Sequence, residues 1–130
     1  MSGPWLLELP QTKPMSLNDR DHWRVKADKT AEYVDTTIVL VRQAKVPKLQ
    51  KISVLLAYGP KDRRVRDPLN LVQTLKAVED AIVRAGVVPD DNPTYVQSLM
   101  PVVLEPGPAN SRGGRLWVLV SDESWTAAAI

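Results

Sequence analysis

Carboxylates and cations gather between residues 62 and 91. This stretch contains Asp62-Arg63-Arg64-Val65-Arg66-Asp67-Pro68-Leu69-Asn70-Leu71, then Lys76, Asp80 and Asp90-Asp91. Magnesium takes hard oxygen ligands and often binds one or two protein carboxylates, with water and phosphate in the other positions. Such an ion polarises a phosphodiester, and a nearby lysine offsets the charge that develops on the phosphate. Asp67 and Asp91 as ligands, with Lys76 as the cation, would therefore make a phosphodiesterase site.

The same residues also have ordinary structural interpretations. Asp67 before Pro68 is typical of a helix N-cap followed by the first helical residue. Asp90-Asp91 could form a solvated turn, and Lys76 with Asp80 has the i,i+4 spacing of a surface ion pair. A helix of about 17 residues between Asp67 and Asp91 would be about 25 Å long. These two carboxylates can meet only if the chain folds back, if another element brings them together, or if two chains combine.

Histidine and cysteine chemistry is nearly absent from this chain. It has no cysteine and a single histidine, His22, which excludes disulfides, thiolate metal sites and a histidine pair for a metal. No serine has the surroundings of a nucleophile elbow, and the six glycines form neither a P-loop nor a dinucleotide fingerprint. Most familiar enzyme classes are thereby disfavoured.

Two basic clusters stand out against a net charge of only +2. One holds Lys61, Arg63, Arg64 and Arg66, and the other holds Arg20, Arg24, Lys26 and Lys29. Clusters of this kind suit a polyanion through charge attraction and counterion release, although two solvated loops would look the same. Trp23, inside the second cluster, is either a packing residue or a platform that stacks on an exposed base.

Hydrophobic spacing predicts six elements that would position these groups. Strands are expected at Trp5–Leu9, Lys51–Tyr58, Tyr95–Glu105 and Arg115–Ser121, and helices at about Ala27–Lys45 and Leu69–Ala85. The order is β-α-β-α-β-β. We expect an α/β fold in which residues 1–130 form one domain, with a mixed sheet of about four strands and both helices on one face. The tail from about residue 122 has little pattern and is expected to fray.

Several boundaries and core positions follow from individual residues. Gly86 is expected to end the second helix in a left-handed conformation, Pro47 to end the first, and Gly59-Pro60 to stop the second strand. Trp5 and Trp117 are expected in the core. The first helix should bury one stripe: Ala27, Ala31, Val34, Ile38 and Val41. No apolar run reaches the roughly 20 residues of a bilayer span, and this favours a cytoplasmic protein.

The stretch from residue 62 to 91 resembles the RusA-type Holliday-junction resolvases, in particular the versions carried by phages of actinobacteria. The family pattern is a basic run, then Arg-Asp-x-Asp-Asn-Leu, a helix with a lysine and an aspartate four residues later, a glycine and an Asp-Asp pair. The corresponding residues are Arg63, Arg64, Arg66, Asp67, Asn70, Leu71, Lys76, Asp80, Gly86, Asp90 and Asp91. The similarity covers about residues 5–120, and its middle third is specific.

The resemblance implies a site and a reaction. Carried over by position, Asp67 is the first metal-binding carboxylate, Asp91 the last, and Lys76 the essential lysine. The family implies an Mg²⁺-dependent homodimer that makes paired nicks across a four-way DNA junction, without a nucleotide cofactor. We then expect two groups of basic residues to hold phosphates. Arg63, Arg64 and Arg66 would lie near the cut, while Arg20, Arg24 and Lys26 would guide a neighbouring arm.

Leu69 departs from the family pattern, because it occupies the place of a second aspartate and cannot bind magnesium. In one alternative Asp90, Asp62 or water completes the coordination, and the protein still cuts DNA. In the other, it binds junction or duplex DNA and cuts poorly or not at all. A protein with no nucleic-acid role would have to carry the basic run and both aspartate sites without using them.

The family lysine has two possible positions in this chain. It commonly falls three residues after the asparagine of the motif, which would place Gln73 there. Lys76 falls six residues after Asn70, but it is preferred because its spacing to the later motif residues fits: Asp80, Gly86 and Asp91.

Overall fold

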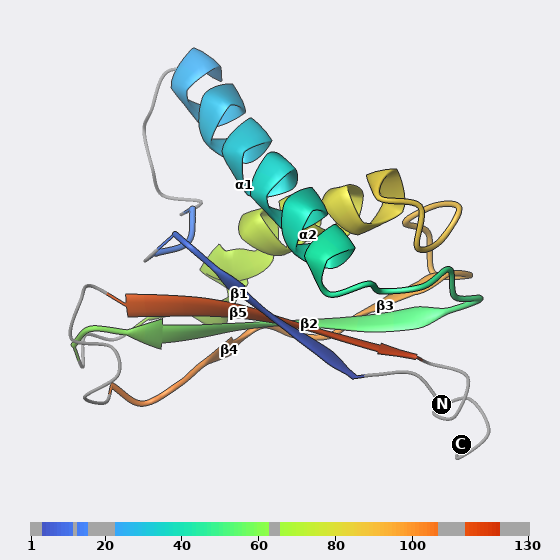
Figure 1. Cartoon of the computed structure of the whole chain (residues 1–130). Coiled ribbons are helices and arrows are strands. Elements are labelled where there is room, and N and C mark those ends of the chain that lie inside the picture. The colour runs from blue at the N-terminus through green and yellow to red at the C-terminus, as the bar shows by residue number, and fades with distance from the viewer. Residues whose placement is uncertain (1–3, 12, 16–22, 63–65, 107–113, 123–130) are drawn as a thin grey trace.

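The computed structural model describes residues 4–11, 13–15, 23–62, 66–106 and 114–122. Five strands in this part of the chain form one mixed sheet, and two α-helices pack on the same face of it (Figure 1). This arrangement confirms the predicted α/β class. None of the helices in the described ranges is long and apolar enough to cross a membrane.

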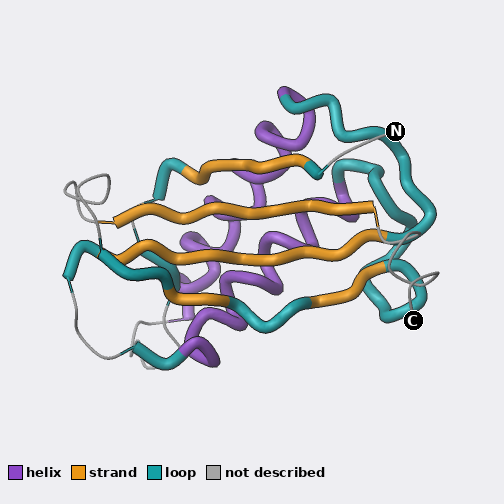
Figure 2. The backbone as a smooth tube through the Cα atoms, turned by 90° about the horizontal axis from the view of Figure 1, so that it is seen from below, coloured by secondary structure: helices purple, strands orange, loops and turns teal. Residues whose placement is uncertain are grey.

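The elements follow the expected order, except that the third predicted strand is divided in two. They are β1 (Trp5–Leu9), α1 (Trp23–Gln43), β2 (Ile52–Pro60), the 3-10 helix η1 (Pro68–Leu71), α2 (Val72–Arg84), β3 (Val96–Ser98), β4 (Val102–Val103) and β5 (Gly114–Asp122). The strand order is β1-β5-β2-β3, and β4 also pairs with β2 (Figure 2). β5 is antiparallel to β1 and β2, whereas β3 and β4 are parallel to β2.

The break between β3 and β4 corrects the prediction of one strand over Tyr95–Glu105. Ser98 pairs with Val54, and Val102 pairs with Ala57. Between these two pairs the segment from β3 to β4 advances by four residues, whereas β2 advances by three. One extra residue therefore interrupts the pairing with β2. Pro101 lies in this interval and has no N–H to donate. Pairing with β2, which sequence spacing does not reveal, determines where the strand divides.

Side chains along β5 alternate between the face of the sheet that the helices cover and the opposite face. Leu116, Val118 and Val120 are fully buried, as expected for the covered face of a sheet. Trp117 lies on the opposite face and is only half-buried, so the prediction that it belongs to the core is wrong. The guanidinium of Arg115 lies 5.0 Å from the centroid of the Trp117 ring. Trp5 is partly buried and packs against the core.

β2 runs two residues further than predicted. Gly59 and Pro60 pair with Arg115 and Gly114, so the strand includes the Gly-Pro pair and ends at Pro60 rather than before it.

α1 begins at Trp23, earlier than predicted, and ends at Gln43. Lys45 has a φ of 57°, so the helix ends in a left-handed residue before Pro47 is reached. The predicted apolar stripe is correct at Val34 and Val41, which are buried, and wrong at its start.

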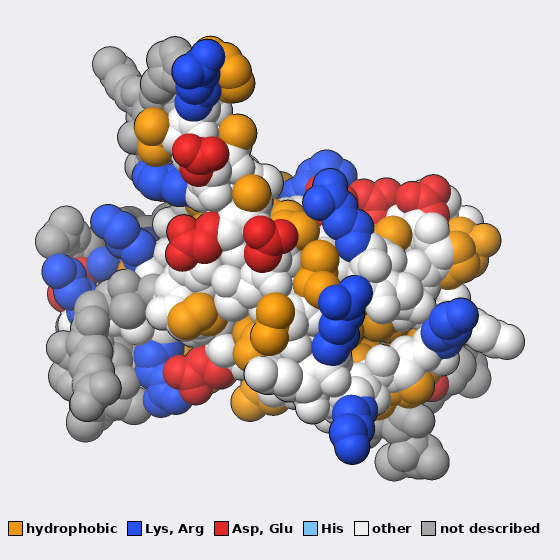
Figure 3. All heavy atoms as spheres, turned by 45° about the horizontal axis from the view of Figure 1, so that its top comes forward, with side chains coloured by type: hydrophobic (Ala, Val, Ile, Leu, Met, Phe, Trp, Pro, Cys, Tyr) orange, Lys and Arg blue, Asp and Glu red, His pale blue; other side chains and the backbone are white. Residues whose placement is uncertain are grey.

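Ala27 and Ala31 are exposed, because the first turns of α1 project beyond the sheet and α2 (Figures 1 and 3). Tyr33 and Thr37 complete the buried face instead. The projecting half of the helix therefore contributes little to the core.

The start and end of the second helical segment are as predicted. The Asp67 carboxylate accepts a hydrogen bond of 2.9 Å from the Leu69 N–H and so caps η1, with Pro68 as its first residue. η1 leads directly into α2, and Gly86 follows at a φ of 88°. The buried face of this segment includes the predicted Leu71, Leu75, Val78 and Ile82.

Candidate active site

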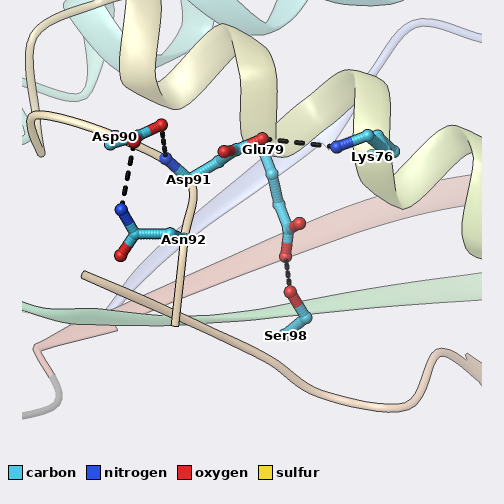
Figure 4. A network of polar contacts seen from close by, with 6 residues as sticks. All are labelled: Lys76, Glu79, Asp90, Asp91, Asn92 and Ser98. Atoms are coloured by element: carbon cyan, nitrogen blue, oxygen red, sulfur yellow. Dashed lines mark hydrogen bonds and ion pairs between the residues drawn. The ribbon is translucent and has the colours of Figure 1, made fainter. Parts of the chain in front are cut away.

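The chain after α2 folds back along the helix. Val87 and Val88 are buried, and the Val87 carbonyl accepts a hydrogen bond of 2.8 Å from the Leu49 N–H. These contacts return the chain toward β3. As a result, Asp91 lies beside the side chain of Lys76, in the first half of α2, rather than beyond the end of the helix (Figure 4).

Lys76 and Asp91 form an ion pair of 3.3 Å between Nζ and Oδ2. The turn that presents Asp91 is stabilised by Asp90, whose carboxylate accepts hydrogen bonds of 2.7 Å from the Asp91 N–H and 3.0 Å from the Asn92 side-chain amide. This arrangement combines two of the alternatives drawn from the sequence. Asp90 holds a turn, and that turn also brings Asp91 to Lys76.

The charges around this ion pair perturb one another. The hydrogen bond to Asp91 raises the pKa of Lys76, and the Lys76 ammonium lowers the pKa of the Asp91 carboxyl. Partial burial raises the pKa of Asp80, and the nearby Asp91 carboxylate adds to that effect although Lys76 opposes it. The lysine is therefore firmly protonated, and its strongest partner is Asp91 rather than the i,i+4 residue Asp80.

Glu79 is a member of this cluster that the sequence analysis missed. It is buried on α2, and the Ser98 hydroxyl of β3 donates a hydrogen bond to its Oε2 (Figure 4). Burial raises the pKa of Glu79. Its position four residues after Leu75 and three before Ile82 places it beside the apolar stripe of the helix, and this spacing was the available signal.

Asp67 lies at a separate location, in the lining of a pocket of about 240 Å³. The pocket is bounded by residues 13–15, the end of β2 and η1. Arg66 also lines it, and its guanidinium forms a 2.7 Å ion pair with Asp62 and lies 5.7 Å from the centroid of the Tyr58 ring. The cation next to Asp67 in sequence thus has an acidic partner of its own.

The two locations are connected by one side of the helical segment. Leu69, Gln73, Lys76 and Asp80 follow one another at spacings of four, three and four residues, which places them along one face. Gln73 and Lys76, the two candidates for the family lysine, therefore lie between the Asp67 pocket and Asp91. Leu69 is 52% exposed.

The predicted metal ligands do not form a three-carboxylate group. Among the described residues, no three acidic or histidine side chains lie close enough to hold a metal ion together. One oxygen of Asp67 caps η1, both oxygens of Asp90 accept bonds within the turn, and Oδ2 of Asp91 contacts Lys76. The structure brings Lys76 to Asp91 and leaves Asp67 at the neighbouring pocket.

The predicted DNA-binding residues are described only in part. Arg20, Arg63 and Arg64 lie outside the described residues. Arg24 and Lys26 lie on the projecting first turns of α1, where basic side chains occupy the tip (Figure 3). Trp23 is 66% exposed, with the Arg24 guanidinium 5.2 Å from its ring centroid. This exposure argues against the interpretation of Trp23 as a packing residue.

Comparisons with known proteins assign no family to this chain. No protein-family model matches it, and no curated protein matches it.

Proposed function

We propose that this chain is a structure-specific DNA endonuclease of the RusA type, which resolves four-way junctions with Mg²⁺ during recombination and repair. The contact between Lys76 and Asp91 carries the proposal. These residues are 15 positions apart in the chain, and the family motif counts both among its functional residues. Their contact supports the proposal because it brings these two motif residues to one place on the surface.

The donor groups suit magnesium in kind. Asp67 and Asp91 offer only carboxylate oxygens, and Mg²⁺ is commonly held by one or two carboxylates together with water and substrate phosphate. When bound, the ion would polarise the phosphodiester and activate the attacking water. Asp90 acts mainly through the turn, because its two oxygens already accept hydrogen bonds.

Lys76 has two roles in this proposal. Its ammonium holds Asp91 in place when DNA is absent, and it lies on the surface, where it can reach a phosphate. A cation beside the scissile phosphate stabilises the negative charge that grows in the transition state. Asp91 and, less strongly, the charge of Asp80 raise the pKa of Lys76, and Glu79 holds this part of α2 against β3.

The basic residues would position the DNA rather than read its sequence. Arg66, together with Arg63 and Arg64, would contact phosphates near the cut, and Arg20, Arg24 and Lys26 would contact a neighbouring arm. Because each released counterion contributes to affinity, binding should weaken steeply as salt rises. The exposed Trp23 would stack on a base at the same arm.

A homodimer belongs to the proposal because a four-way junction must be cut in two strands. Two copies related by a two-fold axis would each make one nick. The reaction would take place in the cytoplasm of a bacterial or phage-infected cell. A monomeric mass at working concentration would contradict the paired-nick mechanism.

The test is cleavage of a labelled four-way junction and a matched linear duplex, each with Mg²⁺ and with EDTA. Wild type is compared with Asp67→Asn, because asparagine also caps helices well and the fold is therefore retained. We expect paired nicks that are confined to the junction, require metal and disappear in the variant. Equal cutting of the linear duplex would contradict junction specificity, and undiminished cutting by Asp67→Asn would exclude Asp67.

A second candidate is a junction-binding protein with impaired catalysis. The observation in its favour is Leu69, which is exposed beside Asp67 where the family has a further metal-binding carboxylate. Tight binding of the junction without nicks would establish this alternative.

A further inference from the structure

The pocket beside Asp67 has apolar walls and polar groups along the same cavity. Its lining comprises Lys13, Pro14, Met15, Tyr58, Arg66, Asp67, Asn70 and Leu71. The volume of about 240 Å³ is below the roughly 300–1,000 Å³ of sites for drug-sized ligands. A pocket of this size suits one flat ring system attached to a larger chain better than a complete small molecule.

Two hydrogen bonds hold residues 13–15, the N-terminal wall of the pocket, in place. The Met15 N–H donates a 2.9 Å hydrogen bond to the Thr74 hydroxyl of α2, and Thr74 is 0% exposed. The Tyr33 hydroxyl of α1 donates to the Lys13 carbonyl. Both helices thus fix residues 13–15, so little ordering is required when a ligand enters.

Two polar side chains in the lining have no hydrogen-bonding partner among the described residues: the amide of Asn70 and the ammonium of Lys13. The neighbouring Arg66 and Asp67 already have partners within the fold. An asparagine amide presents a donor and an acceptor side by side, which matches the paired acceptor and donor on one edge of a nucleobase.

We propose that the pocket binds one unpaired nucleobase of the DNA strand beside the cut, with Asn70 bonding the base edge and Lys13 holding the adjacent phosphate. This inference rests on the proposed function and adds a subsite to it. The apolar walls formed by Pro14, Met15 and Leu71 suit the faces of a base. A phosphate is less suited to the interior, because the Asp67 carboxylate shares the lining.

A base at a branch point is a favourable occupant. Extruding a nucleotide costs least where its pairing and stacking are already disturbed, and the strands exchange partners at a four-way junction. Fully paired duplex has no such position, so the pocket would also contribute to the preference for junctions over linear DNA.

The experiment measures dissociation constants in EDTA, which keeps the strands intact, by fluorescence anisotropy on a set of four-way junctions. The junctions differ only at the nucleotides of the exchange point, which carry A, C, G, T or an abasic site. Wild type should favour one base over the abasic site by about tenfold, within the range that one bidentate contact provides. Asn70→Ala should abolish that preference and bind the abasic junction as wild type does. Lys13→Gln should weaken binding to all junctions equally and make it less dependent on salt.

The matched control is Gln43→Ala, which removes an exposed amide at the end of α1, away from the pocket. It should leave the ratios between the dissociation constants of the five junctions unchanged. A base preference that survives in Asn70→Ala, or a wild type that binds all five junctions equally, would overturn the subsite and leave the nuclease proposal intact. A wild type that binds no junction would overturn both.

Discussion

Two acidic positions flank the first half of the helical segment, and the fold holds them by different means. Asp67 is held by local geometry, because its carboxylate caps the 3-10 turn that immediately follows it. Asp91 is held by tertiary structure, because a folded-back chain delivers it to Lys76. A metal ion could bind a second oxygen of Asp67 without breaking the cap, whereas at Asp91 it would compete with an ammonium. Under the proposed function, Asp67 would therefore be the more accessible metal ligand, and Asp91 would bind the metal only after its contact with Lys76 is released.

The largest expected effect on the nicking rate is that of replacing Asp67. Asp67→Asn should lower the nicking rate by about 1,000-fold or more, since metal-assisted charge stabilisation contributes several kcal/mol. Junction affinity in EDTA should change less than about threefold, and the free energy of unfolding by less than about 0.5 kcal/mol, because the cap is kept. Single-turnover cleavage, anisotropy and denaturant titration measure the three quantities. Parallel losses of cleavage and binding would indicate a role in DNA binding instead.

The next effect concerns the cation. Lys76→Gln should lower the nicking rate by about 100-fold, the loss expected when one preorganised charge is removed from a transition state. Gln73→Ala is the matched control for the alternative family position and should change the rate less than about threefold. If Gln73→Ala proved the more damaging variant, the alignment of the motif would have to shift by one turn.

A smaller, opposite effect is expected at Leu69. Leu69→Asp should raise the nicking rate by about tenfold, because it adds an oxygen ligand beside Asp67 at an exposed position where leucine has little packing to lose. Leu69→Asn provides the control of similar size with a weaker ligand. No gain in Leu69→Asp would mean that water already completes the coordination, or that Asp67 does not bind metal.

The smallest effect is thermodynamic and concerns Glu79. Burial raises its pKa above the ordinary value of 4.5, so its contribution to stability is fully present below about pH 4.5 and is lost as the pH rises through the folded-state pKa. Relative to Glu79→Gln, wild type should therefore lose stability as the pH rises from about 4.5 through the raised pKa of Glu79. Denaturant titrations over this change of pH measure the difference. Glu32→Gln on the exposed side of α1 is the control. If both variants changed the pH dependence of the free energy of unfolding equally, burial of Glu79 would not be its cause.

Residues at its two ends predicted the second helical segment well, but the sequence did not predict how the chain after α2 is arranged. Pro68 and Gly86 mark the start and end of the helical segment through their own backbone preferences. The division of β3 from β4 depends on the register with β2, and the return of Asp91 depends on where Val87 and Val88 find burial. Both are properties of the assembled sheet and core.

The candidate site shows the same limit. The types and spacing of Lys76, Asp80 and Asp91 identified them from the sequence, but only the structure pairs Lys76 with Asp91 in preference to Asp80. Glu79 was not predicted as a member of the site, because an acidic residue beside an apolar stripe is ordinarily expected at the surface. The pocket around Asn70 is formed by segments 13–15, β2 and η1, whose proximity no sequence pattern revealed.

The projecting end of α1 gives one continuous helix two different local stabilities. Its C-terminal half packs against α2 and β1, whereas Ala27 and Ala31 face solvent. Local opening requires little free energy where few apolar contacts must be broken. Amide hydrogens near Ala31 should therefore exchange with deuterium much faster than those near Val41. If DNA occupies that end of the helix, the exchange gradient along α1 should flatten, and the helix itself would then report binding without any label.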